Sequence, residues 1–145
     1  MKIILEERPD VAEAEVRITC RDIDERIRAV IAAVSALDRR LVGIDGGGVV
    51  IVEAADVLYA ESVDGTAFLY GASTVVESPL RLQEIERRLA GTEFVRASRT
   101  LLVNFDHVRA LRPRPNARLE LVLDNGESVI ASRQFAPAIK EKIGL

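Results

Sequence analysis

Four polar side chains that could bind a charged partner directly gather in one short stretch of the chain, residues 94–104. They lie between apolar residues at either end, and they are Arg96, Ser98, Arg99 and Thr100. An ordinary pair of strands does not require four polar side chains at such a place. Arginine, serine and threonine supply hydrogen bonds to phosphate oxygens and to base edges. The stretch therefore indicates a surface for an anionic partner such as a nucleic acid.

Catalytic and metal chemistry have much weaker support. His107 is the only histidine, and it follows Asp106 directly. Neighbouring residues of a strand point to opposite faces, so this pair does not predict a catalytic dyad. One histidine and one cysteine, Cys20, make no metal-ligand cluster, and no serine or cysteine stands in a nucleophile motif. We expect no enzyme, no cofactor and no metal, with His107 in a turn or at a rim.

Charge is distributed unevenly along the chain. The net charge is −3, but residues 1–80 carry −7 and residues 81–145 carry +4. Residues 96–118 contain a single acidic residue and six arginines, which are Arg96, Arg99, Arg109, Arg112, Arg114 and Arg118. Arginine suits forked contacts to phosphate and guanine. Charge alone leaves open a merely solvated β face.

Length and composition limit the class of protein. The 145 residues suffice for one domain with a small extension. No apolar run approaches the roughly 20 residues of a membrane span, and the apolar run at residues 3–5 is too short for a signal peptide. The lone Cys20 cannot form an intramolecular disulfide. We expect a cytoplasmic protein that does not enter a membrane.

Residues 1–41 are expected to form a small ββα extension. Lys2–Glu7 and Glu15–Cys20 are typical of strands joined by a turn at Pro9-Asp10. A helix over residues 23–37, capped at Asp22, carries an apolar stripe. This helix packs on its own strands or serves as a dimerisation surface, and we favour local packing with some role in dimerisation.

Residues 42–145 indicate many short strands interrupted by few helices. Glycine-containing turns at residues 45–48, 63–65 and 124–127 separate apolar runs, as in hairpins. The glycines at 46–48 lack the lysine of a phosphate loop. A helix is expected to start at Ser78-Pro79 and another to end the chain. The fold class is therefore α+β, predominantly antiparallel β. No helix pair is typical of a helix-turn-helix, so loops between strands would have to contact DNA.

Four separated motifs resemble those of one family of output domains. They are Asp56–Glu61, the helix from Leu80 to Leu89, Phe94–Asn104 and Ala131–Gln134. Over residues 42–145 the chain resembles the LytTR-type DNA-binding domains of response regulators. The resemblance implies packed β-sheets whose loops enter successive major grooves. Residues 1–41 are too few for a receiver domain, which implies a stand-alone member.

The resemblance also implies which residues contact DNA. They come from a hairpin end, the polar stretch and the loop before the last helix, and they are Asp64, Thr66, Ala67, Arg96, Ser98, Arg99, Thr100, Ser132, Arg133 and Gln134. The chain departs from the family pattern at Ala67 and Gln134, where many members have polar or basic residues. Glutamine can still read adenine.

The expected function is sequence-specific binding of double-stranded DNA to regulate transcription, as a homodimer on repeated half-sites. The alternative is a cytosolic protein-interaction or ligand-sensing β-domain without DNA binding. Binding to duplex DNA that weakens steeply with salt would distinguish the two.

Overall fold

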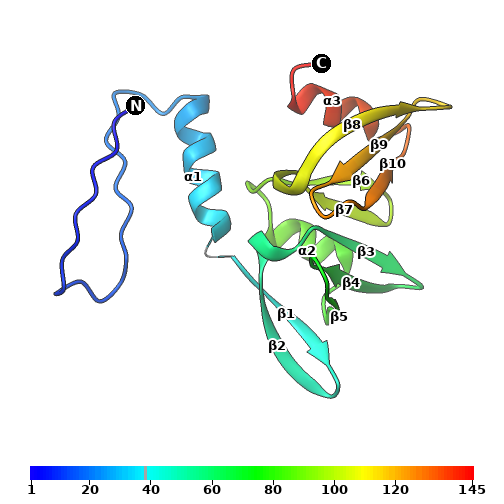
Figure 1. Cartoon of the computed structure of the whole chain (residues 1–145), viewed down its shortest axis with the longest axis horizontal. Coiled ribbons are helices and arrows are strands. Elements are labelled where there is room, and N and C mark those ends of the chain that lie inside the picture. Colours follow the sequence, from blue (N-terminus) through cyan, green and yellow to red (C-terminus); the bar gives the residue numbers. More distant parts are fainter. Residues whose placement is uncertain (38) are drawn as a thin grey trace.

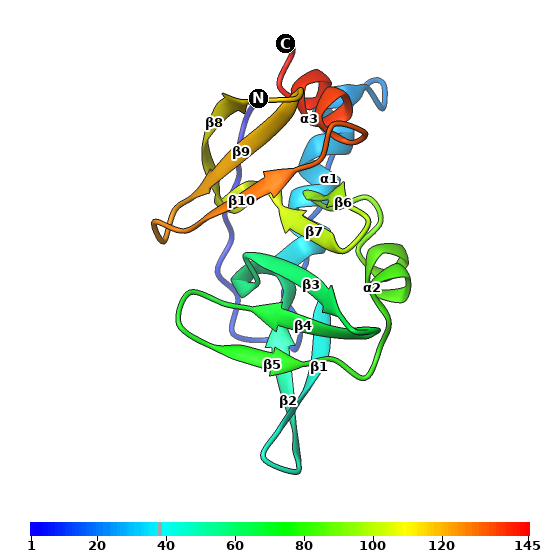
Figure 2. The same ribbon diagram turned by 90° about the vertical axis from the view of Figure 1, so that its right-hand side faces the viewer.

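The computed structural model describes residues 1–37 and 39–145, and it consists mainly of two antiparallel sheets (Figures 1 and 2). The larger sheet has the strand order β2-β1-β5-β4-β3-β7-β6 and the smaller one β10-β9-β8. The expected α+β class with predominantly antiparallel strands is confirmed. Within these described residues, no helix is long and apolar enough to cross a membrane.

The strands of the larger sheet are β1 (Arg40–Asp45), β2 (Gly48–Glu53), β3 (Tyr59–Val63), β4 (Thr66–Tyr70), β5 (Val75–Glu77), β6 (Phe94–Ser98) and β7 (Leu101–Asn104). Those of the smaller sheet are β8 (Val108–Arg114), β9 (Arg118–Leu123) and β10 (Ser128–Ala131). The helical segments are α1 (Glu25–Leu37), α2 (Leu82–Arg88), α3 (Ala136–Lys142) and the 3-10 turns η1 (Ala54–Asp56) and η2 (Phe105–His107).

Hairpin turns set the register of the strands where the sequence predicts them. Asp45 pairs with Gly48 across Gly46 and Gly47, whose φ angles are +56° and +84°. This is a two-residue hairpin turn, and the phosphate-loop alternative does not apply. Asp64 at the tip of the β3–β4 hairpin also has a positive φ, which aspartate tolerates better than most residues.

The two sheets enclose two hydrophobic cores that meet at β7. Side chains from β1, β3, β4 and α2 pack in the first core, where Ile85 and Leu69 are almost fully buried. Side chains from β6, β9, β10 and α3 pack in the second. Along β7, Leu102 points into the first core, while Leu101 and Val103 point into the second. The strand is therefore buried on both faces.

A buried asparagine at the end of β7 ties neighbouring segments together. The Asn104 side-chain nitrogen donates to the Val57 carbonyl at 3.0 Å. Its Oδ1 accepts from the Asp106 amide at 3.1 Å and so caps η2. These bonds satisfy a polar group that would be costly to bury unpaired.

The N-terminal segment differs from the expected ββα unit. Residues 1–20 run as two extended arms that form no strand, although they turn at Pro9-Asp10 as predicted. The Val11 amide donates to the Arg8 carbonyl. Continued from this turn, a hairpin register would place Glu6 opposite Glu13 and Lys2 opposite Arg17. Like charges directly opposite one another destabilise a strand pair, which explains why the predicted strands are wrong.

The two predicted helix starts also shift. The expected cap at Asp22 is wrong, because Asp24 accepts from the Ile27 amide at 3.0 Å and α1 begins at Glu25. The expected start at Ser78-Pro79 is wrong as well. The Ser78 amide donates to Ala67 in β4, and its hydroxyl accepts from the Leu80 amide, so this segment is a turn and α2 begins only at Leu82.

His107 links the two halves of the fold instead of performing chemistry. Its Nδ1 lies 2.7 Å from an Asp124 carboxylate oxygen, and its Nε2 lies 2.6 Å from the Ala55 carbonyl oxygen. Since both partners only accept hydrogen bonds, the protonated ring, with two N–H groups, fits best. Burial lowers the pKa of His107, but the bonds to Ala55 and Asp124 and the charges of Asp124 and Asp106 outweigh this effect and raise it above 6.5.

The raised pKa predicts that stability depends on pH. The contribution of His107 is complete below pH 6.5 and is lost as the pH rises through the folded-state pKa. We expect His107→Gln to lower the free energy of unfolding by about 1–2 kcal/mol near pH 6 and by less near pH 8. Urea denaturation at both pH values measures this difference. An equal loss at both would show that the imidazole does not act through its charge.

Candidate nucleic-acid interface

Two of the three predicted contact segments line one open hollow on the surface. The hollow, of ≈ 390 Å³, is formed by Ser98, Arg99, Thr100, Ser132, Arg133 and Gln134. Ser98 ends β6, Arg99 and Thr100 form the turn between β6 and β7, and the other three residues belong to the loop between β10 and α3. The Ser132 amide donates to the Ala97 carbonyl at 2.8 Å, which fixes one loop against the other.

The β6–β7 turn is held by its own side chains. The pairing of the two strands shifts register between Arg96 and Ser98, so β6 has a bulge just before the turn. The Ser98 hydroxyl accepts from the Thr100 amide at 3.2 Å and lies 3.4 Å from the Thr100 hydroxyl. Arg99 at the apex is exposed. The turn therefore presents Arg99 and Thr100 outward from a fixed backbone.

Arg96 lies behind this turn. Its guanidinium donates to the Arg99 carbonyl at 2.6 Å, and it approaches both carboxylate oxygens of Glu86 on α2 at 3.3 and 3.4 Å. Its side chain is only 15% exposed. The predicted direct contact of Arg96 with DNA is therefore not supported by its placement, because its hydrogen bonds are already used to support the turn. Nothing in the sequence spacing identified Glu86 as its partner.

The third predicted segment, the β3–β4 hairpin, lies beside the first. The Ser62 amide donates to the Thr100 carbonyl at 2.8 Å, and Figure 1 shows both turns along the same edge of the molecule. Asp64 is exposed at the tip and Thr66 is half-buried. Ala67 is only 1% exposed and packs in the first core. The predicted contact through Ala67 is corrected, since its methyl group points away from the surface.

Positive charge on the exposed loops is left available. Among residues 1–37 and 39–145, neither Arg99 nor Arg133 makes an ion pair. At the β8–β9 hairpin, Arg114 stands directly opposite Arg118, and both are exposed. Like charges in such a pair repel one another, and an anion placed beside them would relieve that repulsion.

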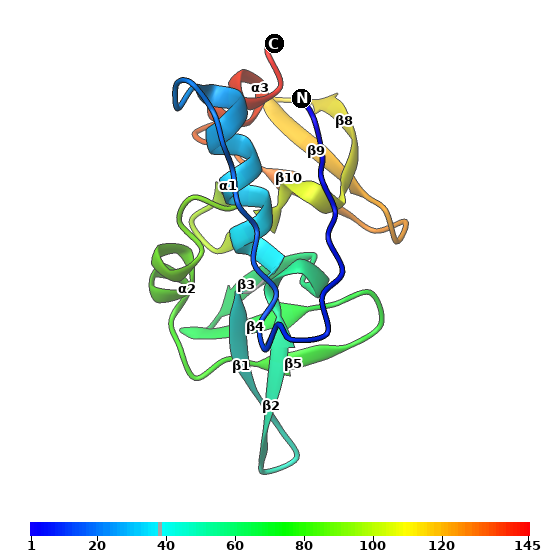
Figure 3. The same cartoon turned by 90° about the vertical axis from the view of Figure 1, so that its left-hand side faces the viewer.

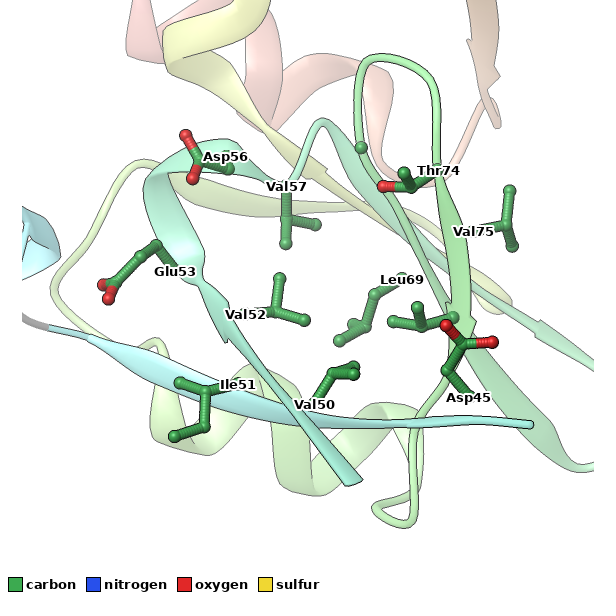
Figure 4. A pocket seen from close by; sticks show the side chains of 12 residues that line it. Asp45, Val50, Ile51, Val52, Glu53, Asp56, Val57, Leu69, Thr74 and Val75 are labelled. Atoms are coloured by element: carbon green, nitrogen blue, oxygen red, sulfur yellow. The ribbon is translucent and has the colours of Figure 1, made fainter. Parts of the chain in front are cut away.

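A second hollow has the opposite character (Figure 4). It lies between the β1–β2 hairpin and the β4–β5 segment, and Val50, Val52 and Leu69 line its interior. The carboxylates of Glu53 and Asp56 stand near its rim. Such a surface repels phosphate, so the loops around Arg99 and Arg133 form the better candidate interface for nucleic acid.

Comparison with known proteins agrees with this geometry. The LytTr DNA-binding domain family matches residues 47–144. The solved LytTr DNA-binding domain of a response regulator from Bacillus cereus superposes with a TM-score of 0.69 and 26% identity, covering 73% of this chain and 97% of that one.

Two relatives extend the comparison. An uncharacterized HTH-type transcriptional regulator of Staphylococcus aureus is 25% identical over 100% of this chain and 99% of its own length. The sensory transduction protein LytT of Bacillus subtilis is 29% identical over 66% of this chain and 40% of its own length.

The chain belongs to the LytTr DNA-binding domain family. It is a DNA-binding transcriptional regulator of a family that is not enzymatic. The S. aureus relative carries an HTH-type name, but strands separate α1, α2 and α3 here, and the segments described on either side of residue 38 contain no helix-turn-helix.

The support that Arg96 gives to the β6–β7 turn can be tested without DNA. We expect Arg96→Ala to lower the free energy of unfolding by about 1–3 kcal/mol, because the Arg99 carbonyl and Glu86 lose a charged donor. Amide hydrogen exchange in residues 98–100 should also accelerate. Arg99→Ala is the matched control and should change stability by less than about 0.5 kcal/mol. Equal effects of both changes would contradict the supporting role of Arg96.

Proposed function

We propose that this protein recognises specific sequences in double-stranded DNA through the β3–β4 and β6–β7 turns of its larger sheet and the β10–α3 loop. The observation that carries the proposal is the hollow in which Arg99, Arg133 and Gln134 are exposed together. The neighbouring residues Thr100 and Ser132 are fixed by backbone hydrogen bonds to Ser62 and Ala97 of the larger sheet. Fixed, exposed donors of this kind suit base edges and phosphates without a large ordering cost.

The exposed side chains divide into two roles. Arg99 at the apex of its turn is suited to a forked contact with guanine, and Gln134 is suited to adenine. Arg133, Ser132, Ser98 and Thr100 border the same hollow and would hold phosphates. At the adjacent hairpin tip, Asp64 could accept from the amino group of cytosine.

The arginines of the β8–β9 hairpin add long-range attraction. Arg114 and Arg118 are exposed and unpaired with acid in the register of that hairpin. They raise the local positive potential although the whole chain is slightly acidic. Affinity for DNA should therefore fall steeply with salt. Salt-independent binding, or capture of proteins only, would favour the alternative of a protein-interaction domain.

The proposal includes assembly as a homodimer in the cytoplasm. A dimer would place two copies of the loop surface on repeated half-sites. Residues 1–41, the extension outside the LytTR-type domain at 42–145, would contribute to the interface. We retain this boundary as a prediction.

Arg99 gives the direct test of base recognition. Arg99→Ala should weaken binding to the selected duplex by about 1–3 kcal/mol and relax the preference at one base pair. Selection of bound fragments from random duplexes, before and after the change, measures both effects. Unchanged affinity and preference in a folded variant would remove Arg99 from the interface.

Two exposed residues of the loop between β10 and α3 are expected to have different roles. Arg133 positions the protein on phosphates, and Gln134 recognises a base. Arg133→Ala should weaken specific and random duplexes alike and reduce the slope of affinity against salt by about one ion. Gln134→Ala should spare random duplexes and change the preference at one base pair. If both variants behave alike on all sequences, this loop positions the protein but reads no base.

A further inference from the structure

The first N-terminal arm exposes both apolar side chains and unpaired backbone. Ile3 and Leu5 are 89% and 91% exposed, and Ile4 is 71% exposed. No strand forms in residues 1–20. Figure 1 shows the two arms beside α1 and away from the sheets, and Figure 3, seen from that side, shows them in front of α1. An exposed apolar segment in extended form is a template for pairing with another chain.

The second arm is a poor partner for the first within one chain. The turn closed by Arg8 and Val11 would place Glu6 opposite Glu13 and Lys2 opposite Arg17, as described above. A two-stranded hairpin is marginal in water even without such repulsion. A pairing partner that meets Lys2 and Glu6 with opposite charges would be more favourable.

We propose that Lys2–Glu6 pairs antiparallel with the same segment of a second copy of this chain, about a twofold axis at Ile4. In this register Ile4 faces Ile4 of the second copy, and Ile3 faces Leu5 of the second copy. Lys2 then stands opposite Glu6 of the second copy. The symmetry repeats the Ile3–Leu5 and Lys2–Glu6 pairs, while the Ile4 pair lies on the axis. The proposal specifies the homodimer of the proposed function, on which it rests, and does not depend on DNA contact.

Charge and apolar pattern both select this register. Centring the axis on Leu5 would place Ile4 opposite Glu6 and Ile3 opposite Glu7. A parallel pairing would place each charge against its own copy. Only the arrangement about Ile4 joins apolar with apolar and lysine with glutamate, and opposite-charge pairs across strands are favourable.

The neighbouring helix can extend the same interface. Ile23 just before α1 and Ile31 within it remain 62% and 44% exposed. Figure 1 shows α1 beside the two arms. Two copies joined at Ile4 would bring these apolar side chains near the symmetric strand pair. The loops around Arg99 face the opposite side and stay free in both copies.

Charge reversal tests the register directly. Lys2→Glu or Glu6→Lys alone should raise the dimer dissociation constant on the order of tenfold, because two attractive pairs become repulsive. The double variant Lys2→Glu/Glu6→Lys should restore dimerisation, since each glutamate again meets a lysine. Sedimentation of the full chain over a range of concentrations measures all four proteins. A monomeric wild type, unaffected single variants or an unrestored double variant would each overturn the proposal.

Cross-linking tests the position of the axis. In a Cys20→Ser background, Ile4→Cys should give a covalent dimer under mild oxidation, because the two residues face each other within reach of a disulfide. Val11→Cys is the matched control, since Val11 is also an exposed apolar residue but lies in the turn. Equal cross-linking at both positions, or none at position 4, would contradict the register.

DNA binding is measured separately. Lys2→Glu should leave affinity for a duplex with one half-site unchanged, because the arms and the β6–β7 turn lie on opposite sides of the molecule. A dimer that responds to the charge reversals but binds no DNA would refute the proposed function and keep the pairing. A chain that binds single half-sites but never dimerises would refute the pairing and keep the proposed DNA binding.

Discussion

Burial of β7 on both of its faces is the constraint on which the rest of the fold depends. Leu102 completes the core beneath the larger sheet, while Leu101 and Val103 complete the core beneath the smaller one. Asn104 then ties the end of this strand to Val57 and η2. Because the candidate DNA-binding turn immediately precedes β7, its position is determined by both cores at once. Damage to either core should displace this turn.

The two arginines at the candidate interface, Arg96 and Arg99, differ in function although they are close in sequence. Arg96 donates inward to the Arg99 carbonyl and to Glu86, so its charge serves the shape of the turn. Arg99 projects outward from the shape that Arg96 maintains. A preorganised contact of this kind loses little conformational entropy on binding. The specificity of a DNA contact by Arg99 would thus depend on Glu86 of α2, which holds Arg96 and does not itself contact the DNA.

Local signals in the sequence predicted much of the fold and less of the site. Turns such as Gly46–Gly47 depend on neighbouring residues and were predicted correctly. The N-terminal strands were predicted from residue type alone, although their pairing depends on charges opposite one another across a turn. The burial of Ala67 and the inward direction of Arg96 depend on contacts with distant segments. Residue types alone do not reveal such contacts.

The stacked tyrosines of β3 and β4 give the protein an optical property of its own. The rings of Tyr59 and Tyr70 lie 4.4 Å apart and nearly parallel. The Tyr59 hydroxyl also donates to Glu127 at the end of the β9–β10 turn, 2.9 Å away. The chain contains no tryptophan and no other tyrosine, so this pair dominates its near-ultraviolet spectrum. Circular dichroism from the stacked pair therefore reports, without any label, whether β3 and β4 remain paired. The hydrogen bond to Glu127 makes the emission of Tyr59 sensitive to the contact between the two sheets.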